Sequence, residues 1–392
     1  MEIDDEEFKL LTVTLSVALV LAACGGGGDG VAPAEPAKSA DPVAYIAGDS
    51  LVDVGVFGVR FTVQSSDTAK PFLVWPELLA NGYNLGKVCA AYNGLSSFAP
   101  IANCTGYGVG AAQINPVDLN TTAVASGINL VTSATVVSDS SPYSIIKQIP
   151  DMGTGRTFGA KDLIMLDGGG NDLKVLAQSF LESIDPMNPV AAQARAAYRT
   201  MLKDLLPAAT VDGVGDAAGD VPALANLGGA YMQAAAAMMA TAIKTNLIAN
   251  GAQRVLVLDA PNLTKVPAFA DVTDPAAQGI VSQWSQAFNA KLRNDLSSES
   301  SKVLVVDFFG TLNGFVANPN TAVVGSVSLS DATAKACGNT DIKICTNTLL
   351  DASGPAGWRT HLFADGLHAT PFGNELLAQT VRSAISTKGW AY

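Results

Sequence analysis

The segment Val43-Ala44-Tyr45-Ile46-Ala47-Gly48-Asp49-Ser50-Leu51 determines how the rest of the chain is interpreted. Its first five residues are apolar, which predicts a buried strand, and Gly48 ends that run. Ser50 therefore lies just beyond a strand, where open α/β sheets place the groups that bind ligands and react with them. Taken alone, Asp49 and Ser50 are equally compatible with the cap of a following helix.

A second segment, Asp365-Gly366-Leu367-His368, contains the base that a serine nucleophile requires. The chain has only two histidines, and His368, unlike His361, follows a carboxylate by three residues. On a helical turn, this spacing would let the carboxylate orient the imidazole, as in a Ser-His-Asp triad. The alternative is a surface turn in which Asp365 caps the last helix.

A third segment lies mid-chain, where Gly168-Gly169-Gly170-Asn171-Asp172 follows the apolar run of residues 161–166. Glycine allows a ligand to approach the backbone closely. Asn171 brings a side-chain N–H donor to a strand end, as an oxyanion hole requires. By itself, this segment is also typical of a plain strand-to-helix turn.

Together, the three segments resemble conserved blocks of the SGNH, or GDSL, superfamily of esterases and lipases. The segment with Ser50 resembles block one, the segment with Asn171 block three and the segment with His368 block five, in the same order along the chain. The second block is matched more loosely by Gly106-Tyr107-Gly108-Val109-Gly110-Ala111-Ala112, which departs from the family pattern at Gly106 and Ala111. The resemblance extends over roughly Pro42 to Ser383. Single blocks are weak signals, but four in order are specific.

The resemblance implies that Ser50 is the nucleophile, His368 the general base and Asp365 the group that orients the base. It also implies an oxyanion hole made by the backbone N–H groups of Ser50 and Gly110 and by the side chain of Asn171. The implied activity is hydrolysis of carboxylic esters through an acyl-enzyme, with no cofactor. A carbohydrate O-deacetylase or an acyltransferase would use the same site, and a non-catalytic surface-binding lipoprotein would keep only the fold.

Motifs for other chemistries match less well. Val52 replaces the last glycine of G-x-S-x-G, so the nucleophile turn of ordinary α/β-hydrolases is not favoured. Ser144-Ile145-Ile146-Lys147 satisfies S-x-x-K, but the S-D-N and K-T-G elements of penicillin-binding enzymes are missing. With two histidines and no Cys-x-x-Cys or His-x-x-x-His, a catalytic metal is not expected.

The composition indicates a packed globular protein, because 48% of residues are hydrophobic and only 15% are charged. The formal net charge is −12; without residues 1–23, which hold five acids and Lys9, 30 acids and 22 bases leave −8. An acidic chain of this kind is a poor partner for nucleic acid.

The N-terminal part is typical of an export signal. Residues 10–23 form a largely apolar run, too short for a comfortable transmembrane helix and suited to a signal peptide over residues 1–23. Leu21-Ala22-Ala23 before Cys24 resembles a bacterial lipobox, which implies a lipidated Cys24. The implied location is the outer membrane, periplasm or cell surface of a Gram-negative bacterium. The alternative is a buried helix with an incidental cysteine.

The flanking segments complete the predicted domain organisation. Residues 1–8 are acidic, unlike the start of a signal peptide, and are interpreted as a misassigned start or a tag. Residues 24–41, rich in Gly, Ala and Pro, are expected to be a flexible tether to one domain, residues 42–392.

The four remaining cysteines are expected to form disulfides, because an even number in an exported chain favours pairing. Three pairings are possible, and short loops favour Cys89–Cys104 with Cys337–Cys345. Buried free thiols are the alternative.

Predicted strands alternate with predicted helices, which indicates a mainly parallel sheet covered on both faces, a three-layer α/β/α fold of SGNH-hydrolase or flavodoxin-like type. Long insertions at residues 93–148, 173–226 and 313–358 are expected to shape the substrate site. The predicted strands are Val43–Ala47, Lys87–Tyr92, Lys161–Leu166, Arg254–Leu258 and Val303–Asp307. The predicted helices are Phe72–Asn81, Ala191–Leu206, Leu227–Asn250, Gln278–Leu296 and Pro371–Thr387.

Overall fold

The computed structural model describes residues 41–94, 98–116 and 141–392. The predicted signal peptide, Cys24 and all of the tether except Asp41 lie outside the described residues. The described residues belong to one compact unit, Ser39–Tyr392. None of the described helices is long and apolar enough to cross a membrane.

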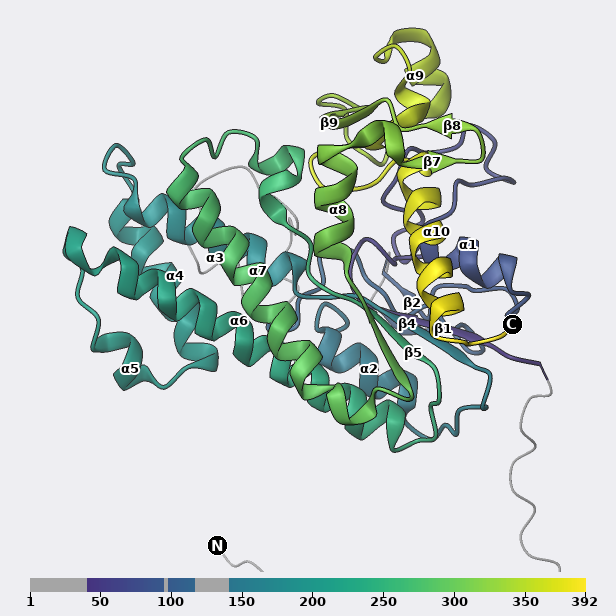
Figure 1. Cartoon of the computed structure of the whole chain (residues 1–392), viewed down its shortest axis with the longest axis horizontal. Helices are drawn as coiled ribbons and strands as arrows, with labels where there is room; N and C mark the ends of the chain where they lie inside the picture. Colours follow the sequence, from purple (N-terminus) through teal and green to yellow (C-terminus); the bar gives the residue numbers. More distant parts are fainter. Residues whose placement is uncertain (1–40, 95–97, 117–140) are drawn as a thin grey trace, which may run out of the picture. The chain divides into compact units, whose positions relative to one another are not determined.

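A four-stranded parallel sheet lies at the centre of this unit (Figure 1). Its order is β1 (Ala44–Ala47), β4 (Leu163–Leu166), β5 (Val255–Leu258) and β6 (Val303–Val306). The strand sequences AYIA, LIML, VLVL and VLVV are apolar on both faces, as in parallel strands that are covered on both sides. These four predicted strands are confirmed.

The fifth predicted strand, Lys87–Tyr92, is wrong. Only the two-residue strand β2 (Tyr92–Asn93) forms there, and it pairs with β3 (Ala99–Pro100). Of the residues before it, Ala90 makes a single bridge to Gly106, and Cys89 is tied to Cys104 by a disulfide. An apolar run of this length does not distinguish a strand from an irregular segment held by a covalent link.

Two helical layers cover the two faces of the sheet, because successive side chains of each strand point to opposite sides. Ile46, Met165 and Leu256 pack on one face with α1 (Trp75–Gly82) and α10 (Pro371–Thr387). On the other face, Tyr45, Ile164 and Val257 pack in a core with residues of α2 (Ile145–Gly153), α6 (Val221–Ile243) and α7 (Pro275–Asp295). The predicted three-layer α/β/α fold is therefore confirmed.

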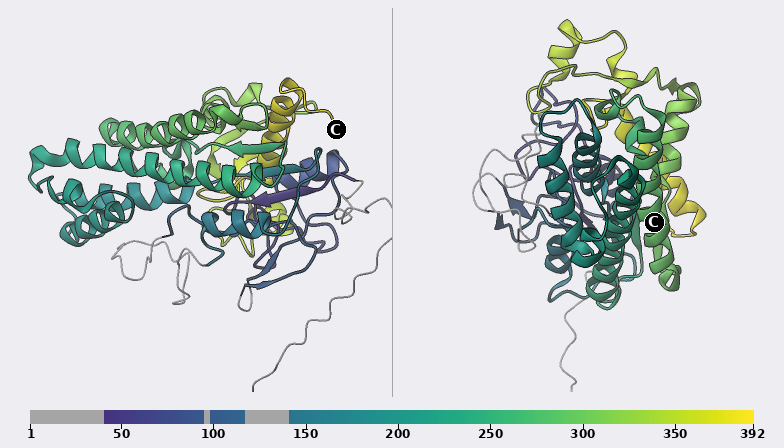
Figure 2. Two further views of the ribbon diagram at one scale, coloured as in Figure 1. Left: turned by 90° about the horizontal axis from the view of Figure 1, so that it is seen from below. Right: turned by 90° about the vertical axis from the view of Figure 1, so that its left-hand side faces the viewer.

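The insertion after β4 is helical. It contains α3 (Gly170–Ile184), α4 (Ala191–Leu205) and α5 (Ala208–Asp212), and α3 packs on α4 while α6 packs on α7 (Figures 1 and 2). Trp284 of α7 stacks on Tyr198 of α4 and meets Phe180 of α3 edge-on, which joins these helices into one layer. Helix α6 begins six residues before the predicted start and ends in a π-turn, Lys244–Ile248.

The insertion after β6 leads to the C-terminal part of the site. It contains α8 (Phe308–Ala317), the hairpin of β7 (Val323–Val324) and β8 (Val327–Ser328), β9 (Asp331–Lys335) and α9 (Asn347–Ser353). Strand β9 pairs in parallel with β10 (His361–Phe363), which ends two residues before Asp365.

Candidate active site

Ser50 lies in the turn that follows β1, and Gly48 makes this turn possible. Gly48 has φ +146°, and a Cβ atom there would lie 1.6 Å from Oδ1 of Asp167, which follows β4. That same oxygen accepts a hydrogen bond from the Asp49 N–H at 2.8 Å. Only glycine leaves room for Asp167 to hold the turn that carries the serine.

Three side chains that are distant in sequence form a continuous hydrogen-bonded chain. The Ser50 Oγ lies 2.8 Å from His368 Nε2, and His368 Nδ1 lies 2.7 Å from Asp365 Oδ2. Ser50 and His368 are buried, 8% and 9% exposed, so water does not compete freely for these bonds. The structure thus brings together Ser50, His368 and Asp365, the three residues selected from the sequence.

Asp365 is held as a carboxylate. Its Oδ1 accepts hydrogen bonds from the backbone N–H groups of Leu367 and His368, each at 2.8 Å. Burial opposes ionisation, but the charge and hydrogen bonds of His368 and these two donors outweigh it and lower the pKa of Asp365 to about 2. A fixed carboxylate on Nδ1 leaves Nε2 to accept the proton of Ser50.

The backbone between Asp365 and His368 is a loop, not the helical turn assumed from the spacing. It connects β10 to α10, and Ala364 N donates to His368 O at 2.7 Å across it. The Phe61 ring lies 5.0 Å from the His368 ring, which restricts the imidazole from the other side. The carboxylate and imidazole still meet because the loop folds back on itself.

Asn171 is the second residue of α3 and lines the same pocket as Ser50. Its Nδ2 donates to the carbonyl of Ala112 at 3.0 Å and to Asp49 Oδ2 at 3.3 Å. The second bond is long and therefore weak. An oxyanion could replace it as acceptor without disturbing the bond that fixes the amide.

The backbone N–H of Gly110 is occupied by another group, contrary to the expectation that it serves the oxyanion hole. It donates to Asp53 Oδ2 at 2.8 Å, and Gly110 does not line the pocket. The neighbouring Ala111 has φ +67°, an uncommon conformation for a residue with a side chain, and its N–H has no acceptor among the described residues. The motif alone did not reveal which amide of this loop is free.

Two aspartates that the sequence reasoning missed hold this loop. Asp53 accepts hydrogen bonds from Gly55, Val56 and Gly110. Asp172 accepts them from Ile114 and Asn115. Burial raises the pKa of each aspartate to about 6, against the opposing effect of these N–H donors. Asp172 was visible in the GGND motif, whereas Asp53 has no sequence signal for this role.

A pair of buried aspartates lies beneath the nucleophile turn. Burial raises the pKa of Asp49 and, together with the charge of Asp49, raises the pKa of Asp167 well above its usual value. Asp167 Oδ2 has no hydrogen-bond partner among the described residues. Asp167 is therefore the member of the pair on which the charge of its neighbour adds most to the effect of burial.

The pocket at Ser50 is lined mainly by apolar side chains. Its empty volume is about 780 Å³, part of which is open to solvent. Apart from the Ser50 turn, Gly170, Asn171, Lys174, His368, Ala369, Gly373 and Asn374, the lining consists of Pro261, Leu263, Val266, Phe308, Leu312, Phe315, Leu362, Phe363, Leu367 and Leu377. A pocket of this kind suits an apolar group next to the nucleophile.

The competing motif at Ser144 does not assemble a site. The Ser144 hydroxyl is buried without a hydrogen-bond partner among the described residues, and Lys147 pairs with Asp151. Within the described part of the chain, no group of three or more His, Cys, Asp or Glu side chains could hold a metal ion.

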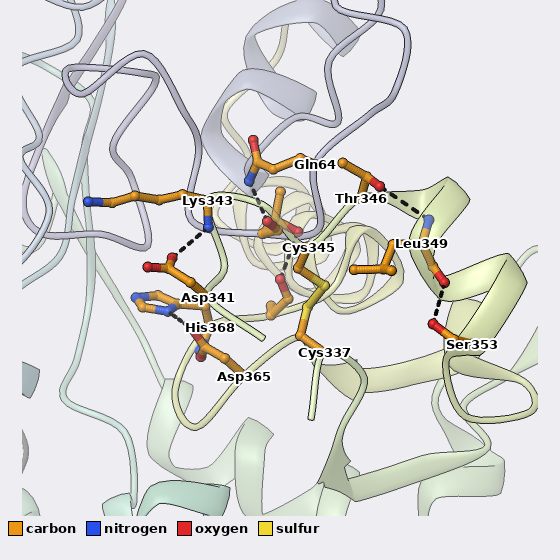
Figure 3. The surroundings of a disulfide bond; sticks show 12 residues. Gln64, Cys337, Asp341, Lys343, Cys345, Thr346, Leu349, Ser353, Asp365 and His368 are labelled. Carbon is orange, nitrogen blue, oxygen red and sulfur yellow. Dashed lines mark hydrogen bonds and ion pairs between the residues drawn. A yellow bond between two sulfur atoms is a disulfide. The ribbon is translucent and has the colours of Figure 1, made fainter. Parts of the chain in front are cut away.

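Both expected disulfides are present, Cys89–Cys104 and Cys337–Cys345. Figure 3 shows the second one beside the Asp365–His368 pair. Cys337 N donates to Ala364 O, just before Asp365, and Cys345 O accepts from Gln64 N, in the segment that follows Ser50. This disulfide therefore connects the segment that carries the base to the segment that follows the nucleophile.

Replacing Cys337 and Cys345 together with alanine is expected to lower the free energy of unfolding by roughly 2–3 kcal/mol. The bridge closes a loop of sequence separation 8, and the chain-entropy relation gives about 2.5 kcal/mol for it. Urea unfolding without reductant measures the loss. The matched pair Cys89→Ala with Cys104→Ala, of separation 15, should lose slightly more. An unchanged urea midpoint would contradict the bracing role.

Comparisons with known proteins leave the family open. No protein-family model matches the chain. No curated protein matches it either. Among solved structures, an extracellular lipase from Streptomyces rimosus is similar at 12% identity and a TM-score of 0.34, over 87% of this chain and 99% of that one. At this level the likeness carries no information on function.

Proposed function

We propose that the protein is a serine hydrolase of carboxylic esters, related to the SGNH esterases and lipases that its motifs resemble. The observation that carries the proposal is the continuous hydrogen-bonded chain from Ser50 Oγ through His368 to Asp365. A protein of this fold that only binds ligands would not need all three of these groups. All three are present and in contact.

In the proposed reaction, Ser50 Oγ attacks the ester carbonyl carbon and His368 Nε2 takes its proton. The charge on the carbonyl oxygen is stabilised by the Ser50 N–H and by Asn171 Nδ2. His368 then protonates the leaving alcohol. Water attacks the acyl-enzyme with His368 as base, and an alcohol in place of water would make the reaction acyl transfer.

The apolar lining favours an ester with an apolar acyl or alcohol part over an acetylated carbohydrate. Sugar hydroxyls would need hydrogen-bond partners, and leucine and phenylalanine side chains offer none. The discriminating experiment measures kcat/KM on p-nitrophenyl esters of increasing chain length beside release of acetate from an acetylated glycan. A maximum beyond acetate supports the proposal, and acetate release from the glycan alone would favour the deacetylase.

Replacing Asn171 with alanine is expected to lower kcat by ~10²- to 10³-fold with little change in KM, as for other oxyanion donors. Its Nδ2 keeps one weak, replaceable bond, to Asp49, so the donor is available when charge develops on the substrate. Steady-state kinetics on one p-nitrophenyl ester test this. If only KM changes, Asn171 binds the ground state and is not an oxyanion donor.

The proposed location is outside the cytoplasm, with the protein anchored to the outer membrane through lipidated Cys24. Two disulfides support export, because such bonds persist in oxidising compartments. Intact-mass measurement of the protein made in a Gram-negative host is expected to show a chain that begins at a diacylated or triacylated Cys24. The matched Cys24→Ala variant should lose the lipid mass. An unmodified Cys24, or cleavage elsewhere, would contradict the anchor.

A further inference from the structure

Lys174 is a buried cation in the wall of the candidate active site. It lies on α3, three residues after Asn171, so the two side chains share one face of the helix. Lys174 is 6% exposed and lines the pocket together with Ser50 and His368. A buried lysine of this kind is uncommon unless its charge is paired.

No described residue pairs with the Lys174 ammonium group: it makes no hydrogen bond and no ion pair among the described residues. The carboxylates that raise the pKa of Lys174 by attracting its charge are Asp365 and Asp49. Both already accept hydrogen bonds from other groups, Asp49 from Leu51 and Asn171 and Asp365 from His368 and Leu367, and neither is bonded to Lys174. The ammonium group is therefore left with unused donors inside the pocket.

Lys174 is nevertheless charged at neutral pH. Burial lowers its pKa, and the attraction of Asp365 and Asp49 limits the fall, so that the pKa of Lys174 is about 8. Burying an unpaired ammonium group among apolar side chains is unfavourable. A bound anion that accepts its hydrogen bonds would stabilise it.

We propose that Lys174 is a specificity residue that binds a carboxylate or phosphate group carried by the ester substrate. This inference rests on the proposed ester hydrolysis and names the substrate class as anionic esters. One helical turn separates Lys174 from the oxyanion donor Asn171, so the anionic group lies a few bonds from the scissile carbonyl. The group belongs either to the acyl part or to the alcohol part, and the same lysine contact serves both.

The test compares two matched pairs of esters. In the first pair, p-nitrophenyl hydrogen adipate and p-nitrophenyl hexanoate differ by a carboxylate on the acyl part. In the second, para-carboxyphenyl butyrate and phenyl butyrate differ by a carboxylate on the alcohol part. For each pair, the ratio of kcat/KM for the anionic ester to that for the neutral ester is measured. A general loss of activity cancels in this ratio.

Lys174→Met is expected to lower the ratio ~10- to 100-fold for one pair, as expected for a lost hydrogen bond to a charged group. The pair that responds identifies the acyl or the alcohol side. Lys265→Met is the matched control: it removes an equal charge from an exposed lysine outside the pocket, and the ratio should not change. Equal ratios in wild type and Lys174→Met for both pairs would overturn the proposal.

Two further measurements separate a loss of folding, and a failure of the proposed function, from a failure of this inference. Circular dichroism checks folding, and Lys174→Gln replaces Lys174→Met if the methionine variant does not fold. If wild type hydrolyses none of the four esters, the proposed function fails, and calorimetric titration with adipate then decides the inference. Adipate binding that Lys174→Met abolishes supports an anion site at this lysine. Absent binding, or binding unchanged in that variant, overturns it.

Discussion

Replacing Ser50 with alanine is expected to abolish ester hydrolysis while the fold remains intact. The Ser50 hydroxyl bonds to His368 and to no other described residue, so its removal takes away the nucleophile without breaking a structural network. Loss of a triad member costs on the order of 10⁴- to 10⁶-fold in kcat. Steady-state kinetics measure the loss, and near-UV circular dichroism checks the packing.

Ser144→Ala is the matched control for this variant. Ser144 is fully buried and belongs to the competing S-x-x-K motif, yet its hydroxyl has no partner among the described residues. Its removal should leave activity unchanged. A Ser50→Ala enzyme that keeps even a tenth of wild-type activity, or an inactive Ser144→Ala enzyme that is folded, would refute the assignment of the nucleophile.

Replacing His368 with alanine is expected to reduce kcat on the order of 10⁴-fold or more, because Ser50 then loses the base that accepts its proton. His361→Ala provides the contrast within the same short segment. His361 is buried in β10, its Nδ1 has no partner among the described residues, and its ring does not line the pocket. That variant should keep most of its activity and lose roughly 1–3 kcal/mol of stability, as for other buried truncations.

Parallel kinetics and urea unfolding of the two histidine variants check this prediction. The expected pattern is a loss of activity without a large loss of stability for His368→Ala, and the reverse for His361→Ala. A folded but inactive His361→Ala paired with an active His368→Ala would exchange their roles and remove Asp365 from the mechanism.

The sheet and the three central side chains could be predicted from the sequence because their signals are local. Each of the four strands is a short apolar run, and Ser50 follows one of them directly. Asp365 and His368 are close in sequence, so their contact survives even though the backbone between them forms a loop. Helix α3 was missed because it begins inside the glycine motif, after Gly169 with φ +86°.

The occupancy of individual donors could not be predicted, because it depends on partners far apart in the chain. The Gly110 N–H is taken by Asp53, 57 residues away, and no pattern around either residue indicates that bond. Lys174 is similar: in sequence it is one of three charged residues of α3, with Asp172 and Glu182, and a charged residue in a helix usually lies at an exposed position. Only the packing of α3 against the pocket shows that the charge is buried.

The separation of Ser50 from His368, 318 residues along the chain, makes the site a late product of folding. The base reaches the nucleophile only after α10 packs against α1 and the sheet. Contacts between such distant segments form slowly. A chain in which α10 has not yet packed therefore has no assembled nucleophile and base, and under the proposed function it does not hydrolyse esters before that step.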